Sequence, residues 1–232
     1  MEIKDKFLNN NQKFNQGAED FEIWFKNNKN LFMTEFKALE KMITDPKNCI
    51  SIGVGNGLLA KKLGIKKGVE PSHGMAELAR KKGIEVIDGR AEKVPLETAS
   101  TKQVLLGTIL AYVDDKRKAV KEAYRILEKG GEVIISILPA ESSFALLYRL
   151  VSIEGYYLNN ISPEYPYPIE FLEGTDWIST EDLIAIMEET GFKNLEFLQT
   201  LTKHPKYANE AVEEAVRGYK KGDYVVVKGV KN

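Results

Sequence analysis

Short apolar runs alternate with amphipathic stretches between residues 49 and 138. The apolar runs have the length of buried strands, whereas the stretches between them carry apolar residues at helical spacing. Strands and helices that alternate in this way are typical of an α/β fold with a largely parallel sheet. The predicted strands cover residues 49–52, a run that ends at 69–70, and residues 84–88, 104–108 and 132–138.

Two of the intervening helices have residues at their ends that favour a start or a stop. Pro71 and Ser72 open a helix that ends by Gly83, and Asp114 or Asp115 caps a second one. Gly130 and Gly131 follow the last apolar position of that second helix, so we expect them to close it.

The segments on either side of this region have other patterns. Residues 18–44 fit two short amphipathic helices that break near residues 27–30, and we interpret them as a helical cap. Beyond Pro139 the order weakens into an apolar, tyrosine-rich stretch that runs to Trp177. Ser179 then caps a helix that Gly191 terminates, and two last strands lie near residues 195–201 and 224–230.

Composition excludes several classes of protein. The 232 residues carry 33 basic and 34 acidic side chains, and this near-zero net charge argues against a nucleic-acid partner that is held by phosphate neutralisation. One cysteine, Cys49, and two histidines, His73 and His204, cannot assemble a disulfide or a zinc cluster, so no metal site is predicted. The chain has no apolar run long enough to span a membrane, and its first twenty residues lack a secretory signal. We therefore expect a cytoplasmic protein without a membrane partner.

Three alternating glycines, Gly53, Gly55 and Gly57, lie between the first strand and the next helix. A glycine turn in this position lets the backbone approach a nucleotide closely. The nicotinamide fingerprint requires its third glycine at position 58, which is Leu58 here, so a nicotinamide-dependent oxidoreductase is the weaker alternative. Glu70, at the end of the second strand, can accept hydrogen bonds from both hydroxyls of a ribose.

These segments resemble the class I S-adenosylmethionine-dependent methyltransferases, in particular the small stand-alone enzymes grouped with the ubiquinone-biosynthesis and other small-molecule methyltransferases. The resemblance covers roughly residues 20 to 232. The matching motifs are Gly53-Val-Gly-Asn-Gly57, Gly68-Val-Glu-Pro-Ser72, Gly89-Arg-Ala-Glu-Lys-Val-Pro95, Tyr112-Val-Asp-Asp115 and Leu127-Glu-Lys-Gly-Gly131.

The resemblance implies a Rossmann-like, seven-stranded mixed sheet with its last strand antiparallel and helices on both faces. It implies one methyltransferase domain over residues 1–232, with a helical cap (1–45), a cofactor-binding half (46–138), a lid and acceptor region (139–178) and a C-terminal helix and strands (179–232). It also implies S-adenosylmethionine as cofactor and S-adenosylhomocysteine as product. The glycine turn would pass under the methionine part, Glu70 would hold the ribose, and Thr108 would lie at the methyl-transfer end. The implied cofactor-binding residues are Ser51, Gly53, Val54, Gly55, Gly57, Glu70, Pro71, Met75, Arg90, Ala91, Glu92 and Thr108.

Position 51 departs from the family pattern. The family usually has Asp or Glu two residues before the first motif glycine, where it organises the turn, and this chain has Ser51. We expect weaker cofactor binding as a result. The departure also leaves open a second interpretation, a non-catalytic S-adenosylmethionine-binding regulatory or interaction protein.

The acceptor is suggested by a charge bias between residues 150 and 192. This stretch has no Lys or Arg and has nine carboxylates, which gives it a formal charge of −9, and it is rich in aromatic residues. Carboxylates among aromatic faces favour a cationic ligand, so one hypothesis is a small amine or imidazole-type acceptor bound by Glu154, Glu164 and Glu170. Some similar small enzymes have been likened to histamine methyltransferases. The alternative is an acidic face that only contacts solvent.

An amine acceptor requires a base, because only the neutral amine can attack the methyl group. Tyr112, which follows the fourth strand, and His204 are the candidate catalytic residues. A packing role for Tyr112 and a structural role for His204 are the alternatives.

Overall fold

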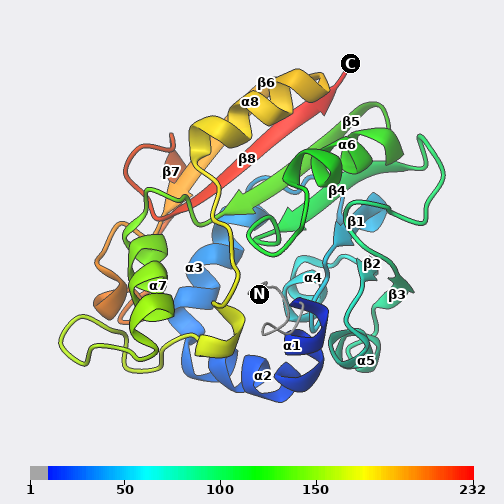
Figure 1. Ribbon diagram of the computed structural model, residues 1–232. Coiled ribbons are helices and arrows are strands. Elements are labelled where there is room, and N and C mark those ends of the chain that lie inside the picture. Colours follow the sequence, from blue (N-terminus) through cyan, green and yellow to red (C-terminus); the bar gives the residue numbers. More distant parts are fainter. Residues whose placement is uncertain (1–9) are drawn as a thin grey trace, which may run out of the picture.

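One mixed β-sheet forms the centre of the protein in the computed structural model, which describes residues 10–232 (Figure 1). Its first five strands are parallel, and β8 runs antiparallel to its neighbours β5 and β6. The strand order in the described residues is β3 (Glu85–Asp88), β2 (Lys67–Glu70), β1 (Cys49–Ile52), β4 (Thr101–Gly107), β5 (Leu127–Ile137), β8 (Tyr224–Lys231), β6 (Phe192–Thr200) and β7 (Val216–Arg217).

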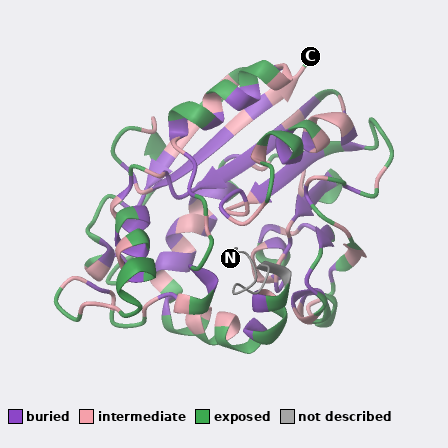
Figure 2. Cartoon of the chain, in the orientation of Figure 1, coloured by how far each residue is buried: buried purple, intermediate pink, exposed green. Residues whose placement is uncertain are grey.

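Helices cover both faces of this sheet because its strands alternate between two apolar cores (Figure 2). On β4, Leu105 joins the core beneath α3 (Lys29–Glu40) and α4 (Leu58–Leu63), whereas Val104 and Leu106 join the core beneath α6 (Lys116–Ile126) and α8 (Thr180–Thr190). Side chains of successive strand residues point to opposite faces, so a strand that is apolar throughout is buried on both faces of the sheet. A fifth helix, α5 (His73–Lys81), follows β2.

Three N-terminal helices close over the carboxyl ends of the central strands. In Figure 1, α1 (Asn10–Gln16), α2 (Ala18–Asn27) and α3 form an arc from α5 towards α7 (Ser143–Glu154). The arc is anchored by asparagines at α1 and at the start of α3. Asn15 Oδ1 accepts hydrogen bonds from Ser72 Oγ and from the Gly74 N–H, each at 2.9 Å, and Asn209 Oδ1 accepts one from the Leu31 N–H at 3.1 Å. Side chains of the arc are therefore fixed above the strand ends.

The predicted fold class is confirmed, with helix ends as expected at several positions. Ser72, Asp115 and Ser179 each accept a hydrogen bond from a backbone N–H in the first turn of their helices, and Gly191 ends α8 with a left-handed backbone. The break in the cap falls at Asn28, between α2 and α3. Residues 1–9 of the predicted cap lie outside the described residues.

Three details of the prediction were wrong. The sheet has eight strands in the described residues, because the two-residue β7 pairs with β6. Helix α6 ends at Ile126, and Gly130 and Gly131 lie within the long β5 instead of closing the helix. Helix α7 was not predicted, although Ser142 caps its start and Gly155 its end. Its apolar residues occupy more than one face, so the 3.6-residue period is weak there.

Within residues 10–232, no helix is both long and apolar enough to cross a membrane.

Candidate active site

The glycine turn after β1 is held by the end of β2. The Gly53 and Val54 N–H groups both donate to the Val69 carbonyl, at 2.7 and 3.0 Å. The Gly55 N–H donates to Glu70 Oε2 at 2.8 Å. A Cβ on Gly57 would lie 2.8 Å from the Ala79 Cα, and the backbone φ of Gly57 is +76°. This contact with α5 explains why the third glycine is at position 57.

Glu70 is a buried carboxylate with a double role in this turn. Its Oε1 accepts a hydrogen bond from the Ser72 N–H at 3.0 Å, while Oε2 accepts the one from Gly55. Burial raises the pKa of Glu70, and the two backbone N–H donors oppose that rise. The turn is thus organised by Glu70 and Val69, the task that an acidic residue at position 51 was expected to perform. Ser51 itself is buried and lines the adjoining cavity.

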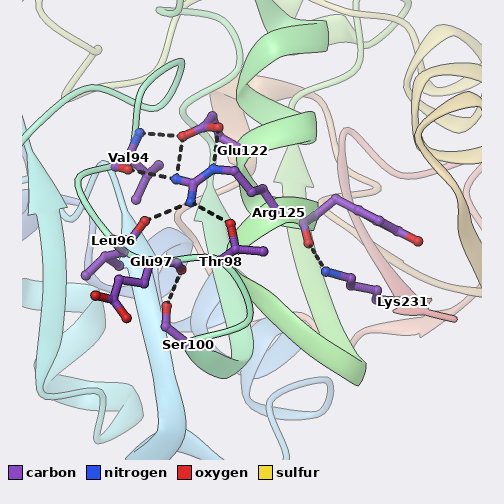
Figure 3. A network of polar contacts seen from close by, with 9 residues as sticks. Val94, Leu96, Glu97, Thr98, Ser100, Glu122, Arg125 and Lys231 are labelled. Atoms are coloured by element: carbon purple, nitrogen blue, oxygen red, sulfur yellow. Dashed lines mark hydrogen bonds and ion pairs between the residues drawn. The ribbon is translucent and has the colours of Figure 1, made fainter.

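The loop after β3 is fixed to helix α6 by the paired side chains of Glu122 and Arg125, which hydrogen-bond to the loop backbone (Figure 3). Arg125 donates to the Val94 carbonyl at 2.9 Å and to the Leu96 carbonyl at 2.8 Å, and Glu122 accepts from the Val94 N–H at 2.8 Å. The same loop carries Arg90, Ala91 and Glu92 to the edge of the cavity. Arg125 is therefore a positioning residue for this loop.

We expect Arg125→Ala to weaken S-adenosylhomocysteine binding about tenfold, because two carbonyls lose their charged donor and the loop loosens. Arg125 does not line the cavity, so the effect would be indirect. Isothermal titration calorimetry on the folded variant measures it. Lys121→Ala, an exposed change on the same helix, is the control, and equal affinity in both variants would contradict the prediction.

Thr108 ends β4 with a strained backbone. Its φ is +57°, in the left-handed region that β-branched residues avoid. The conformation is held by hydrogen bonds from the Thr108 N–H to the Ser136 carbonyl, at 3.0 Å, and to the Ser136 hydroxyl, at 3.1 Å. Strain of this kind is concentrated at functional sites, and Thr108 lies in the wall of a cavity.

These segments surround one cavity of about 220 Å³. Of the predicted site residues, Gly57 and His204 are not part of its wall. His204 is exposed and caps a short 3-10 helix, Pro205–Tyr207. The predicted residues that line the cavity are Ser51, Gly53, Val54, Gly55, Glu70, Pro71, Met75, Arg90, Ala91, Glu92, Thr108 and Tyr112.

The end of the cavity away from β2 is lined by aromatic side chains from the cap, from the loop after β4 and from the lid. Their rings pack against one another, with Trp24 5.1 Å from Tyr167 and Tyr148 5.7 Å from Trp177, measured between centroids. The Tyr112 and Tyr167 hydroxyls are 3.2 Å apart. The aromatic residues of this cavity wall are Phe14, Phe21, Trp24, Phe25, Phe32, Tyr112, Phe144, Tyr148, Tyr167 and Trp177, and we call this end the aromatic chamber.

One carboxyl group, that of Glu35 on α3, lies in the aromatic chamber. Burial raises its pKa from 4.5 to about 8, and within residues 10–232 it has no ion pair or hydrogen bond to lower it. Glu35 interacts electrostatically with Tyr112, Tyr148 and Tyr224. The other charged residues of the cavity wall, Glu70, Arg90 and Glu92, come from the ends of β2 and β3.

Glu35 was not among the residues predicted from the sequence, although a signal was present. Glu35 lies four residues after Leu31 and four before Leu39, both of which are buried, so the charge falls within the apolar face of the helix. The nine carboxylates of residues 150–192 that were considered instead are all exposed, and none lines the cavity. The acidic stretch is therefore a solvated face, and only its aromatic residues Tyr167 and Trp177 reach the cavity.

The strand order begins 3-2-1-4-5, a glycine turn follows β1, and a buried acid ends β2. These features define an α/β enzyme that binds a nucleotide-containing cofactor at the switch point of its sheet. Comparisons with known proteins specify the class. Residues 50–135 match a family described as a methyltransferase domain. A Thermotoga maritima S-adenosylmethionine-dependent methyltransferase, described as a possible histamine N-methyltransferase, has a crystal structure that superposes with a TM-score of 0.86. It is 34% identical in sequence, over 96% of this chain and 100% of that one.

Two curated proteins are also similar to this chain, and the second of them is a methyltransferase. The protein MJ1123 of Methanocaldococcus jannaschii is 30% identical over 218 residues, which are 94% of this chain and 98% of that protein. The ubiquinone/menaquinone biosynthesis C-methyltransferase UbiE of Campylobacter jejuni is 30% identical over 142 residues, which are 56% of this chain and 59% of that enzyme. The chain belongs to the S-adenosylmethionine-dependent methyltransferases. Its cofactor is S-adenosylmethionine, and its product cofactor is S-adenosylhomocysteine.

The cavity wall fits this cofactor. A Cβ on Gly55 would meet no atom within 4 Å, so the turn leaves open space in the cavity above its backbone. An open glycine cradle is a feature that a polar ligand would complete. In the aromatic chamber, the buried Trp24 Nε1 has no hydrogen-bond partner within the described residues, which leaves a donor for a polar ligand there.

Proposed function

We propose that the enzyme methylates a small amine or imidazole-type acceptor held in the aromatic chamber. The observation that carries the proposal is the single carboxyl of Glu35 among aromatic faces. Aromatic rings attract a cation through their negative faces, and a carboxylate adds charge and a hydrogen-bond acceptor. The similarity to the Thermotoga maritima enzyme, a possible histamine N-methyltransferase, supports the same acceptor class.

We further propose the residues that hold the cofactor. Glu70 would accept the ribose hydroxyls with the carboxylate lone pairs that Gly55 and Ser72 leave free. Met75 and Ala91 are buried apolar residues of the wall and suit the adenine. When bound, S-adenosylmethionine supplies an electrophilic methyl group on a sulfonium.

The remaining catalytic work belongs to the chain itself. With both ligands bound, the three helices of the cap and the aromatic wall would exclude water, and Thr108, which follows β4, would contribute to the wall beside them. Methyl transfer to a lone pair needs alignment and desolvation more than a covalent intermediate. Tyr112 contributes to the wall. Burial raises its pKa to about 12, so it remains a neutral hydrogen-bonding group at physiological pH.

The experiment is a radiometric methyl-transfer screen over amines and imidazoles with the wild type, Glu35→Gln and Glu170→Gln. We expect Glu35→Gln to raise the KM for the accepted amine at least tenfold, because the variant loses a charge-assisted contact of ~1.5–3 kcal/mol. Glu170 is an exposed lid acid, and we expect its variant to behave like the wild type.

Two results would contradict the proposal. One is turnover that is confined to oxygen or carbon acceptors. The other is a Glu35→Gln variant with a normal amine KM but a raised Kd for S-adenosylhomocysteine, since Glu35 would then bind the amino group of the cofactor.

A further inference from the structure

An amine acceptor that binds in the aromatic chamber as an ammonium ion must be deprotonated there. A protonated amine has no free lone pair, so it must lose a proton before it can attack a methyl group. A permanent negative charge nearby would stabilise the ammonium form and oppose that loss. We infer that the carboxylate of Glu35 takes this proton, an inference that rests on the proposed amine acceptor.

Other titratable groups that face Glu35 do not fit the task. They are phenols from three segments packed against α3: the loop after β4, helix α7 and strand β8. Burial raises the pKa of each of them, so none is an anion near neutral pH. These phenols are Tyr112, Tyr148 and Tyr224, and Tyr167 of the lid is raised in the same way.

The two histidines do not reach the chamber, because His73 and His204 are exposed and neither lines the cavity. Arg90, the one cation of the described cavity wall, pairs with Asp114 and Glu92 at the edge of the cofactor end. Within the described residues of the aromatic chamber, Glu35 is left as the group that exchanges a proton between about pH 6 and 9.

The environment of Glu35 makes it a stronger base than an exposed carboxylate. Burial raises its pKa to about 8, and the same desolvation lowers the pKa of an amine that enters the chamber. The two pKa values converge, so a proton can pass from the nitrogen to a carboxylate oxygen at small cost. The N–H electron pair stays on the nitrogen, which becomes the nucleophile, and no other atom or electron is exchanged. The proton returns to solvent when the product leaves and the chamber hydrates.

Proton counting during binding tests this assignment without turnover. The ligands are benzylamine, histamine and benzyltrimethylammonium, titrated into the S-adenosylhomocysteine complex by calorimetry at pH 7 in buffers of different ionisation enthalpy. Benzyltrimethylammonium has no proton to lose, so any released proton comes from the protein. With a pKa of about 8, Glu35 is about nine-tenths protonated at pH 7 and must ionise to face the cation. We expect about 0.9 proton released per bound cation in the wild type and none in Glu35→Gln.

The outcomes separate the inference from the proposed function. If none of the three ligands binds, the amine-acceptor proposal fails. If they bind and release no proton, or release as many from Glu35→Gln, Glu35 is not the proton acceptor although the acceptor class stands. Glu35→Asp keeps the carboxyl, so we expect it to retain the proton release and confirm that the variant sites remain folded.

A kinetic comparison adds a second test for whichever acceptors turn over. At about pH 8 imidazole acceptors are mostly neutral, whereas alkylamines are mostly protonated. We expect Glu35→Gln to lower kcat for alkylamines at least 100-fold and for imidazoles less than threefold. An equal loss for both would show that Glu35 only binds or positions the acceptor.

Discussion

Glu70→Gln is expected to raise the Kd for S-adenosylhomocysteine about 100-fold or more, a cost of ~3 kcal/mol. The carboxylate now accepts the Gly55 and Ser72 N–H groups on its two oxygens. An amide in its place has one oxygen and one NH₂ group, so either orientation sets a donor against a backbone donor. The variant therefore disturbs the glycine turn and also loses half of its acceptors for the ribose. Calorimetric titration measures the change.

The chain offers a matched control for this change. Asp88 ends the neighbouring strand β3 in register with Glu70, but it is exposed and outside the cavity wall. Asp88→Asn removes the same charge at the same edge of the sheet, and we expect its Kd to equal that of the wild type. A Glu70→Gln protein that binds as tightly as Asp88→Asn would remove Glu70 from the proposed cofactor site.

Local chemistry explains why much of the cofactor half was predictable. Strand β1 and its glycine turn are adjacent in the sequence, and Ser72 caps α5 only two residues after Glu70. Each element is specified by a short segment of sequence. Parallel strands bring their carboxyl ends to one edge of the sheet, independently of the loops that follow them. All of the predicted cofactor-binding residues except Gly57 consequently line one cavity.

The aromatic chamber is formed by contacts between segments that are distant in the sequence, and the spacing of residues along the chain cannot reveal such contacts. Glu35 meets Tyr148 and Tyr224 across more than a hundred residues, and the sequence gives no register between a cap helix and a lid. The density of acids in residues 150–192 pointed to carboxylates outside the cavity wall, because local charge is a poor guide to which side chain faces a cavity. One acid on an apolar helix face was the better indicator, since burial without a partner is costly and persists where function requires it.

The burial of Glu35 without a partner leads to a second large effect, on the stability of the fold. The folded pKa of Glu35, about 8, is above its ordinary value of 4.5, so the carboxyl contributes no penalty below about pH 4.5 and an increasing one as the pH rises through 8. Glu35→Gln keeps the shape of the protonated group and cannot ionise. We expect it to be more stable than the wild type by ~2 kcal/mol near pH 8.5, less than the full shift implies because a cavity of this size admits water beside the carboxylate.

Urea denaturation of the ligand-free proteins, at about pH 5.5 and about pH 8.5, measures this difference. The advantage of Glu35→Gln should be small at the lower pH and largest at the higher one, because only in the wild type does Glu35 ionise in the unfolded chain while it stays largely protonated in the folded protein up to about pH 8. Glu40→Gln changes an exposed acid on the same helix and should follow the wild type at both pH values. An advantage independent of pH would mean that Glu35 is not protonated in the free enzyme. A gain in stability together with a loss of amine methylation would show that the fold carries this carboxyl for its chemistry, at the expense of its own stability.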